Sequence, residues 1–335
     1  MPTLVPDLLC DPFGERATLI VRKPLQLLGA EFQFESNSRQ LLRLADLACA
    51  GLPRHRLSAV VPRLRVGLRV SSGKRTYGRS EPPPLGMMSG AGFLGGATDS
   101  SSFVALSPQQ RTALVVVSPQ MLRFPYHTRY ELIEFAVYTL AARAQGLVSL
   151  HGACVGRGRQ GVLLMGASGA GKSTLALHCL LQGFDFLSED SVFVTPDTLL
   201  ATGLANFMHV RSDSLRWIAG SREAARIRKS RVIRRRSGVS KFEVDLRRGD
   251  YRLAASALKV GAVVFLSARS ANGQALLTRL SKADLLARLR TTQAYAANQP
   301  EWTTFSRSVS GVDAFELRRG HHPREAVEAL RGLLD

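Results

Sequence analysis

The chain has 335 residues, of which 45% are hydrophobic, and a formal net charge of +19 at pH 7. Its length suits about two domains of roughly 150 residues each, with enough apolar residues to form cores. The sequence holds no run of about 18 uncharged apolar residues, and residues 1–10 lack the basic segment that opens a secretory signal. These features argue against a membrane protein and an exported one, so we expect a soluble, cytoplasmic protein without a membrane partner.

The positive charge comes mostly from arginine and raises the question of a nucleic-acid partner. The basic residues are spread along most of the chain, and no segment alternates them with aromatic residues as a base-stacking surface would. We therefore expect no nucleic-acid partner. The densest basic cluster lies between residues 226 and 236. We interpret it as a solvated loop, and the alternative is a docking surface that attracts an acidic protein or peptide.

Residues 1–125 have the pattern of a small α+β accessory domain. Residues 31–35 and 63–70 alternate polar and apolar side chains, which predicts half-buried strands. Between them, residues 38–50 place leucine and alanine side chains along one helical stripe, with Ser38 as the N-cap. A sheet with one covering helix is the expected arrangement.

Residues 71–102 differ from the rest of this domain because glycine, serine and proline dominate them. Such a composition is typical of loops, and it predicts a long flexible segment. A lid over a nucleotide is one role for it. We favour a flexible connection, because nothing in the segment is committed to binding phosphate.

The second predicted domain covers residues 126–335 and opens with a helix. Residues 128–131 form the pattern of a capping box, apolar residues follow at helical spacing, and Gly146 stands where a C-terminal glycine stop belongs. Two apolar strands are expected next, at 148–155 and 161–165, joined by a polar turn. His151 then lies on a strand adjacent to the segment that follows.

That segment is a complete G-x-x-x-x-G-K-[ST] loop between an apolar strand and an apolar-faced helix. Glycines let backbone N–H groups turn inward around a polyphosphate, and the helix N-terminus adds its positive end. The lysine reaches the β- and γ-phosphate oxygens, and the serine hydroxyl can bind Mg²⁺. A chance glycine-rich turn is the alternative, which the four fixed positions and their flanks disfavour. The residues assigned to a bound nucleotide are Gly166, Ala167, Ser168, Gly169, Ala170, Gly171, Lys172, Ser173 and Thr174.

Two adjacent carboxylates, Glu189 and Asp190, end the next predicted strand, at 184–190. Only 16 residues separate Lys172 from Glu189, whereas GTPases and motor-type ATPases usually place the Mg²⁺-associated aspartate much later. The short interval favours a phosphotransferase. Carboxylates at the carboxyl end of a strand arrive at the crevice where open α/β sheets bind ligands. Residues 191–195 are expected to return as a strand paired with the preceding one.

The rest of the chain continues the alternation of strands and helices. Residues 259–267, 274–280 and 312–317 are apolar runs typical of strands. Ser281 opens a helix through a capping box, and residues 323–334 close the chain as an amphipathic helix.

The combination of His151-Gly152, the 166–174 loop, Gly183-Phe184 and Ser188-Glu189-Asp190 resembles the kinase domain of HPr kinase/phosphorylase and its kinase-only relatives. The resemblance covers about residues 131–335. It implies an α/β fold, a P-loop kinase domain of the HPr-kinase/phosphoenolpyruvate-carboxykinase-like type, preceded here by the smaller N-terminal domain.

Carried over residue by residue, the resemblance assigns Lys172 to the nucleotide phosphates and Ser173 with Asp190 to Mg²⁺. It makes Glu189 the base that acts on an acceptor serine, in a position where the family usually has aspartate. It also gives His151 a role in orienting or neutralising a phosphoryl oxygen. Without the resemblance, a strand histidine hydrogen-bonded in the core would be the favoured interpretation.

One signature of the bifunctional enzymes is missing. Residues 206–213 replace the Arg-Gly-x-Gly pattern that the family carries downstream of the carboxylates, so no dephosphorylating activity is expected. Arg211 is a further candidate for the active site.

These features predict an ATP-dependent serine kinase that uses Mg²⁺ and phosphorylates a small protein or a ribosomally made peptide, with an acidic acceptor among the options. One alternative is a small-molecule kinase of the shikimate-kinase type. Another is a nucleotide-gated binding or regulatory module. The acceptor and the phosphate donor beyond a nucleoside triphosphate stay open, and so does the oligomeric state, with a homo-oligomer as one option.

Overall fold

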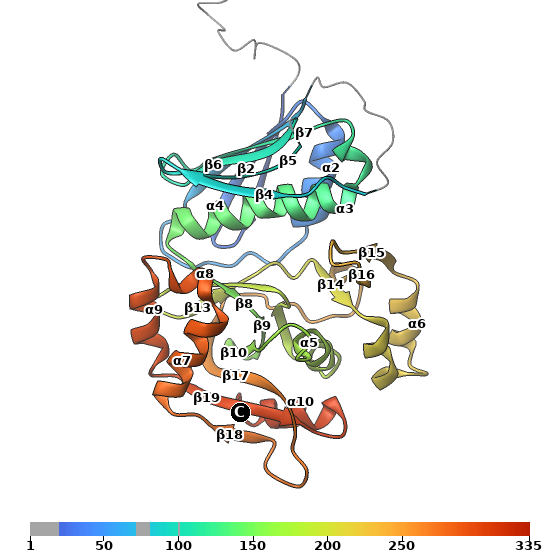
Figure 1. Ribbon diagram of the computed structural model, residues 1–335, viewed down its shortest axis with the longest axis vertical. Coiled ribbons are helices and arrows are strands. Elements are labelled where there is room, and N and C mark those ends of the chain that lie inside the picture. The colour runs from blue at the N-terminus through green and yellow to red at the C-terminus, as the bar shows by residue number, and fades with distance from the viewer. Residues whose placement is uncertain (1–19, 72–80, 100) are drawn as a thin grey trace, which may run out of the picture.

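The computed structural model describes residues 20–71, 81–99 and 101–335. Two layered units are stacked along the long axis of the molecule, with the N-terminal unit at the top of Figure 1 and the C-terminal unit below it. Both units combine sheets with helices, which confirms the mixed α/β class. Among the helices of the described residues, none is both long and apolar enough to cross a bilayer.

The N-terminal unit is built on a seven-stranded sheet with the order β1-β2-β3-β7-β6-β5-β4. Strands β2, β3 and β7 pair in parallel, and the remaining neighbours are antiparallel. The burial of β2 alternates residue by residue, as its period-two pattern predicts. The strands are β1 (Val21–Leu27), β2 (Ala30–Ser36), β3 (Arg63–Val70), β4 (Gly86–Gly90), β5 (Phe93–Asp99), β6 (Ser102–Ser107) and β7 (Thr112–Val117).

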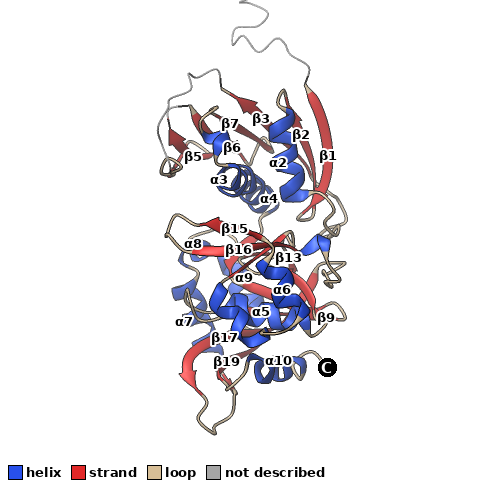
Figure 2. Ribbon diagram, turned by 90° about the vertical axis from the view of Figure 1, so that its right-hand side faces the viewer, coloured by secondary structure: helices blue, strands red, loops and turns tan. Residues whose placement is uncertain are grey.

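Helices cover one face of this sheet, on the side of the C-terminal unit (Figures 1 and 2). Ser38 caps the first helix, as predicted, because its hydroxyl accepts the N–H of Leu41 at 3.4 Å. Gly146 ends the last helix with a φ of +61°, also as predicted. The helical segments are α2 (Arg39–Cys49), α3 (Pro125–His127), the π-helical segment η2 (Thr128–Glu134) and α4 (Phe135–Gln145).

The predicted capping box at residues 128–131 is wrong. The helix already begins at Pro125, and the Thr128 hydroxyl donates to the carbonyl of Met121 at 2.8 Å instead of capping a helix. The domain boundary predicted at residue 125 assigns α4 to the second unit. The buried side chains of α4, such as Val137 and Leu140, instead pack in the core of the first sheet.

The glycine- and serine-rich stretch expected as a loop over residues 71–102 forms a β-hairpin at 86–99, so that expectation is corrected there. Ala91 and Gly92 have φ of +48° and +79°, the left-handed conformations of a two-residue hairpin turn. A Cβ on Gly95 would lie 2.5 Å from the carbonyl oxygen of Val104. Glycine here permits close strand packing rather than flexibility. Residues 72–80 and 100 lie outside the described residues.

The C-terminal unit is built on a nine-stranded sheet with the order β11-β9-β10-β17-β13-β12-β8, extended by β18 and β19. β17 lies at its centre and pairs in parallel with both β10 and β19. The predicted hairpin between 184–190 and 191–195 is wrong, because β11 pairs with β9 whereas β12 pairs with β8 and β13. The strands are β8 (Val148–His151), β9 (Ala153–Arg157), β10 (Gln160–Met165), β11 (Asp185–Ser188), β12 (Ser191–Val194), β13 (Leu200–Thr202), β17 (Leu258–Ser270), β18 (Leu277–Arg279) and β19 (Asp313–Arg319).

Helices cover both faces of this sheet, so its central strands are apolar on both sides. In β10, Val162 and Leu164 pack on the face covered by α5 and α10, whereas Leu163 and Met165 pack on the face covered by α7, α8 and α9. Ser281 caps α7, as predicted. The helices are α5 (Lys172–Leu181), α6 (Arg222–Arg228), α7 (Lys282–Thr292), α8 (Ala294–Ala297), α9 (Trp302–Val309) and α10 (Pro323–Arg331).

A third sheet of three antiparallel strands, in the order β14-β16-β15, lies beside α5 and below the N-terminal unit (Figure 1). It includes part of the arginine-rich stretch, for which the sequence predicts a solvated loop. That interpretation is corrected, because the stretch contains α6 and β15 and ends in a hairpin. The strands are β14 (Phe207–Val210), β15 (Arg231–Arg234) and β16 (Ser240–Asp245).

Candidate nucleotide-binding site

The loop of residues 166–171 connects the end of β10 to the start of α5 and lines a cavity of about 600 Å³. Gly169 and Gly171 have φ of +79° and +104°, which other residues rarely adopt. A Cβ on either glycine would meet nothing within 4 Å. Glycine is therefore required by the backbone conformation and not by a lack of space. The turn leads into α5, whose first N–H groups have no partner within the helix and whose N-terminus favours anions.

Lys172 is the first residue of α5, and its side chain lies inside the loop. Its ammonium group donates to the carbonyl oxygens of Gly166 at 2.7 Å and Ala167 at 3.2 Å. Burial lowers its pKa from the ordinary lysine value, and the nearby carboxylates Asp190 and Glu189 counteract this only in part. Phosphate oxygens bound at the loop would therefore stabilise the charged form of Lys172.

The two hydroxyl residues after Lys172 have different surroundings. Ser173 is partly exposed and lines the cavity. The hydroxyl of Thr174 lies 2.9 Å from that of Ser214 in the 3₁₀ segment η3 (Ser212–Ile218). Thr174 thus connects α5 to the wall of the cavity, whereas Ser173 has its hydroxyl available for a ligand.

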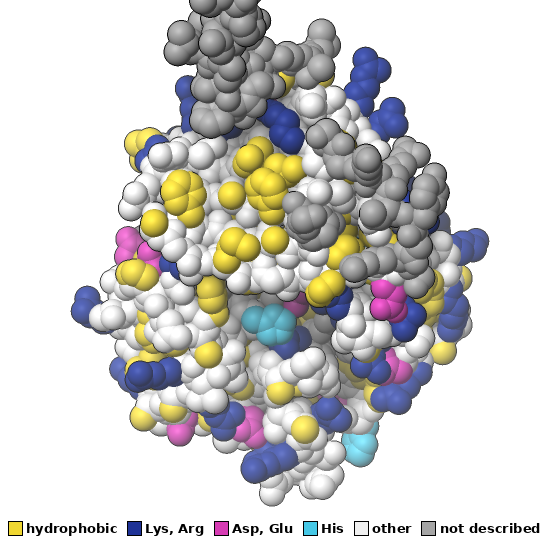
Figure 3. Space-filling model, turned by 45° about the horizontal axis from the view of Figure 1, so that its top comes forward, with side chains coloured by type: hydrophobic (Ala, Val, Ile, Leu, Met, Phe, Trp, Pro, Cys, Tyr) yellow, Lys and Arg dark blue, Asp and Glu magenta, His cyan; other side chains and the backbone are white. Residues whose placement is uncertain are grey.

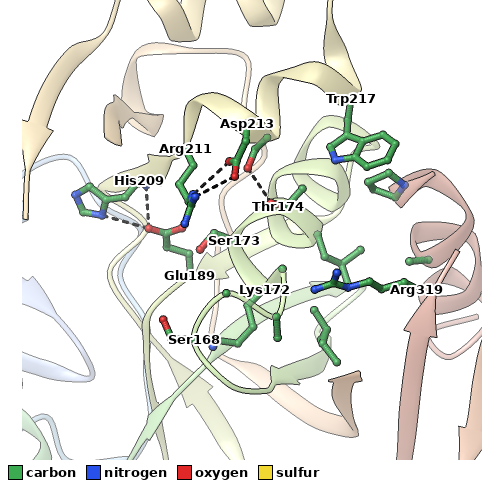
Figure 4. A pocket seen from close by; sticks show the side chains of 18 of the residues that line it. Ser168, Lys172, Ser173, Thr174, Glu189, His209, Arg211, Asp213, Trp217 and Arg319 are labelled. Atoms are coloured by element: carbon green, nitrogen blue, oxygen red, sulfur yellow. Dashed lines mark hydrogen bonds and ion pairs between the residues drawn. The ribbon is translucent and has the colours of Figure 1, made fainter. Parts of the chain in front are cut away.

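Glu189 follows β11 and points toward the third sheet. Its Oε1 accepts the backbone N–H of His209 at 2.8 Å and lies 3.2 Å from Nδ1 of the same residue. Its Oε2 is buried and has no hydrogen-bond partner among the described residues. Figure 4 shows Glu189 on the same side of Lys172 as Ser173 and His209. A buried carboxylate oxygen without a partner is costly, so this atom is suited to accept a proton or bind a cation.

Asp190 points a different way, into a cluster of donors. Its Oδ2 accepts the Tyr130 hydroxyl at 2.9 Å and lies 3.6 Å from Nη2 of Arg235, and its Oδ1 lies 3.3 Å from Nδ1 of His151. Burial alone would raise the pKa of Asp190, but Arg235, His151 and the Tyr130 hydroxyl outweigh burial and lower it. Asp190 is therefore an anion at neutral pH. Asp190 and Glu189 therefore point in different directions.

His151 ends β8 and lines the cavity, with 57% of its side chain exposed. Its backbone is held by one side chain, since Oε1 of the buried Gln293 accepts the N–H of His151 at 2.7 Å and Nε2 donates to its carbonyl at 3.1 Å. The ring is thus in the cavity and not in a core.

A buried charge network lies behind Glu189. The guanidinium of Arg129, which is 1% exposed, bonds both Glu134 and Glu243. Nε2 of His209 lies 3.4 Å from Oε1 of Glu243, so His209 stands between Glu243 and Glu189. Burial lowers the pKa of His209, but its contacts with the Glu189 and Glu243 carboxylates outweigh burial and raise it. The π-helical segment η2, with its i→i+5 hydrogen bonds, places Arg129 and Glu134 on one face.

The electrostatic balance of the cavity is positive. Seven lysine and arginine side chains line it against the three carboxylates Glu189, Asp190 and Asp213. Figure 4 shows Trp217 and Arg319 on the other side of Lys172 from Glu189, so the cavity has an aromatic end and an acidic end. The basic side chains are Lys172, Arg211, Arg216, Arg235, Lys241, Arg318 and Arg319. Such a lining suits a polyanion with an aromatic group.

The residues present fit Mg²⁺ bound together with a nucleotide. The described part of the chain holds no cluster of three or more His, Cys, Asp and Glu side chains that could bind a metal alone. Mg²⁺ is typically held by one or two carboxylates together with substrate phosphates, and Ser173, Glu189 and Asp190 offer oxygen atoms at the loop.

Several residues of the site are not found by sequence reasoning. Arg235 is partly buried beside Asp190 and lies over the Tyr130 ring at 5.2 Å, although it is one member of an arginine run. The only signal in the sequence is that run, and nothing in it separates Arg235 from the exposed Arg234. Arg211, a candidate from the sequence, lines the cavity and pairs with Asp213 at 3.1 Å.

Comparison with known proteins adds little to this geometry. No family model matches the chain, and no curated protein matches it. Among solved structures, the chain is similar to the structure of the Hpr(Ser) kinase/phosphatase from Coxiella burnetii, with 12% sequence identity and a TM-score of 0.28. The similarity covers 55% of this chain and 94% of that chain. At this TM-score the similarity carries no argument, and the assignment of function rests on the cavity itself.

Proposed function

We propose that this protein is an ATP-dependent phosphotransferase that phosphorylates a serine hydroxyl on a small protein or peptide. The observation that carries the proposal is the convergence of three features on one cavity. The phosphate loop with Lys172, two carboxylates that point in different directions, and an excess of basic side chains all line it. Phosphoryl transfer depends mainly on positioning and charge neutralisation, which is what these groups supply.

Each loop residue has a role in holding the nucleotide. The loop backbone and the N-terminus of α5 would bind the phosphates, and Lys172 would exchange its bonds to the Gly166 and Ala167 carbonyls for bonds to phosphate oxygens. Trp217 and Arg319, at the other end of the cavity, would take the base and ribose. Mg²⁺ bound with ATP would neutralise charge on the β- and γ-phosphates, with Ser173 and Asp190 as its protein ligands.

The reaction is a displacement at the γ-phosphorus. The serine oxygen forms a bond to phosphorus, the bond from phosphorus to the β–γ bridging oxygen breaks, and ADP leaves with that electron pair. Glu189 takes the serine proton, since its Oε2 has no other partner in the described residues. Asp190 stays ionised because of its lowered pKa, and it holds Arg235 and His151 beside the phosphates. These two side chains would neutralise charge on the transferred group.

Intact-mass spectrometry tests the proposal. Purified full-length protein is mixed with Mg·ATP and each of the small proteins encoded next to its gene. We expect about 80 Da, the mass of a phosphoryl group, to be added to one of them, and the addition to disappear with Glu189→Gln. A product carrying the mass of a nucleotidyl group would assign a different reaction. A wild-type protein that neither binds nor consumes Mg·ATP would contradict the proposal.

A further inference from the structure

A second cavity, of about 770 Å³, lies between the two units of the molecule. Its volume is in the range of ligand-binding pockets. Residues from the β4–β5 hairpin and α4 form its N-terminal side, and residues from β8, β12 and the α7–α8 region form its C-terminal side. Figure 3 shows hydrophobic side chains gathered on the upper half of the molecule, above a hollow in which a histidine is visible. Neither the phosphate loop nor the two carboxylates line this second cavity.

The lining is apolar and includes large side chains that water still reaches. Met87, Met88 and Tyr295 line the cavity and are 59%, 61% and 58% exposed. Flexible methionines are common on surfaces that bind varied peptides. Strand β4 is the edge of its sheet, pairs only with β5 among the described strands, and carries no charged residue to block another strand. An extended peptide can add to such an edge.

The cavity has one permanent charge, that of Arg143 in α4. No aspartate or glutamate lines the cavity. The guanidinium lies over the Tyr295 ring at 5.9 Å, and its buried Nε has no hydrogen-bond partner among the described residues. An arginine in this setting would be stabilised by a charge-assisted hydrogen bond to a carboxylate. Charge complementarity therefore indicates an occupant that is apolar but carries at least one acidic group.

The second cavity meets the first at His151, which lines both. Gln293 also lines the second cavity, and it holds the backbone of His151 through two hydrogen bonds. Asp190 lies 3.3 Å from His151 on the side of the nucleotide site. A chain bound in the second cavity can thus continue past His151 toward the carboxylates.

We propose that the second cavity is the docking groove for the acceptor: an extended peptide segment with large apolar side chains and a carboxylate that binds Arg143. The segment lies along β4 and α4, and the acceptor serine next to it reaches the first cavity at His151. The acceptor part of this inference rests on the proposed function. Peptide docking does not require catalysis, so the two can fail separately.

A binding experiment without nucleotide tests the groove. An array of decapeptides, each with one serine, one glutamate and varied leucine and valine positions, is probed with the full-length protein. The best binder is resynthesised with fluorescein, and its Kd is measured by anisotropy. We expect Arg143→Gln to weaken binding about tenfold or more, and the glutamine version of the peptide to show the same loss. Combining both changes should cause no further loss, because they remove the same contact.

Three further variants separate an effect on the groove from a general effect on the surface. Met88→Glu, which places a negative charge in the groove, should abolish binding, whereas Met88→Leu should retain it. Arg307→Gln is the matched control, since Arg307 is an exposed arginine on α9 outside both cavities, and it should leave the Kd unchanged. These three variants and Arg143→Gln should all bind Mg·ATP like the wild type.

Several outcomes would overturn the docking groove. One is an array in which no peptide binds, and another is a Kd that Arg143→Gln leaves unchanged. A third is a loss of affinity that grows when Arg143→Gln is combined with the glutamine version of the peptide. A photo-crosslinking residue at position 88 of the full chain identifies other occupants, and a crosslink to the chain's own N-terminal residues or to a second copy would also overturn it. Peptides that bind as expected but are never phosphorylated refute the proposed function alone. Equal phosphorylation by wild type and Arg143→Gln refutes the groove alone.

Discussion

Arg129 is the side chain on which the buried charge network most depends. It is 1% exposed and bonds Glu134 and Glu243, which are 2% and 6% exposed. Arg129→Met keeps the apolar stem but leaves two buried carboxylates without their arginine. Breaking a buried ion pair by removing one partner costs on the order of 3–5 kcal/mol. His209, at 3.4 Å from Glu243, would offset part of the missing positive charge. We therefore expect the free energy of unfolding to fall by about 3 kcal/mol, the lower end of that range.

The loss should depend on pH. In the wild type, burial would raise the pKa of Glu243, but its bonds to His209 and Arg129 outweigh burial and lower it. Its ionised form therefore stabilises the fold above the unfolded pKa of about 4.3, and this contribution is lost as pH falls. In Arg129→Met, burial raises the pKa of Glu134 and Glu243 above the value in the unfolded chain. Above that raised pKa both carboxylates would be ionised and buried without their arginine, so the variant is most destabilised there. The difference between wild type and variant should shrink from pH 8 to pH 5.

Urea unfolding at pH 8 and pH 5 measures this difference, with the fluorescence of Trp217 and Trp302 and far-UV circular dichroism as readouts. A triple variant with Arg129→Met, Glu134→Gln and Glu243→Gln is the control, because it removes the unpaired charges and should recover much of the stability. A loss below about 1 kcal/mol at pH 8, or one that does not change with pH, would refute the reasoning.

Three further predictions concern the cavity and the hairpin. Glu189→Gln should slow transfer to serine by about 10²-fold or more, as measured by kinetics, while calorimetry should find its Mg·ATP affinity nearly intact. Asp190→Asn should raise the Mg²⁺ requirement in the kinetic assay and weaken nucleotide binding in the calorimetric one. Arg235→Gln should weaken the affinity for Mg·ATP about 10- to 100-fold in the same titration, whereas Arg234→Gln should leave that affinity unchanged. Of these two arginines, Arg235 is the one that contacts Asp190. Gly95→Ala should lower the free energy of unfolding by about 1–3 kcal/mol, because the new Cβ would lie 2.5 Å from a carbonyl oxygen.

Each of these has a result that would count against it. If Mg·ATP binding is lost in Glu189→Gln and kept in Asp190→Asn, the roles of the two carboxylates are reversed. Equal effects at Arg235 and Arg234 would mean that the arginine run acts through its total charge. Gly90→Ala is the control for the hairpin, because a Cβ there meets nothing within 4 Å, and a loss equal to that of Gly95→Ala would discredit the steric argument.

The elements that could be predicted from the sequence are those that local physics determines. The alternation of residues 31–35 predicts β2, Ser38 and Ser281 predict helix starts, and Gly146 predicts a helix end in the left-handed conformation. In each case the signal and its structural partner lie within a few residues. The turn at residues 166–171 belongs to the same class, because its conformation depends on its own glycines and on the contact of Lys172 with the carbonyl of Gly166.

The features that could not be predicted depend on distant contacts. The pattern at residues 128–131 resembles a helix start, but contacts with Met121 and with the third sheet make it the interior of a helix. Gly95 looks like a flexible glycine until Val104 on the neighbouring strand is placed beside it. The importance of Arg235 depends on its reach to Asp190, 45 positions earlier in the chain, at 3.6 Å. Composition cannot carry that information.

The central claim is that the 166–174 loop binds Mg·ATP through Lys172, and calorimetric titration of the wild type and Lys172→Ala with Mg·ATP tests it most directly. We predict one site per chain in the wild type. In Lys172→Ala, the affinity should fall by about 10- to 100-fold, since a hydrogen bond to a charged group contributes about 1.5–3 kcal/mol, and the unfolding midpoint should be unchanged. A wild-type protein that releases no heat with Mg·ATP, or a variant that binds it equally well, would contradict the account.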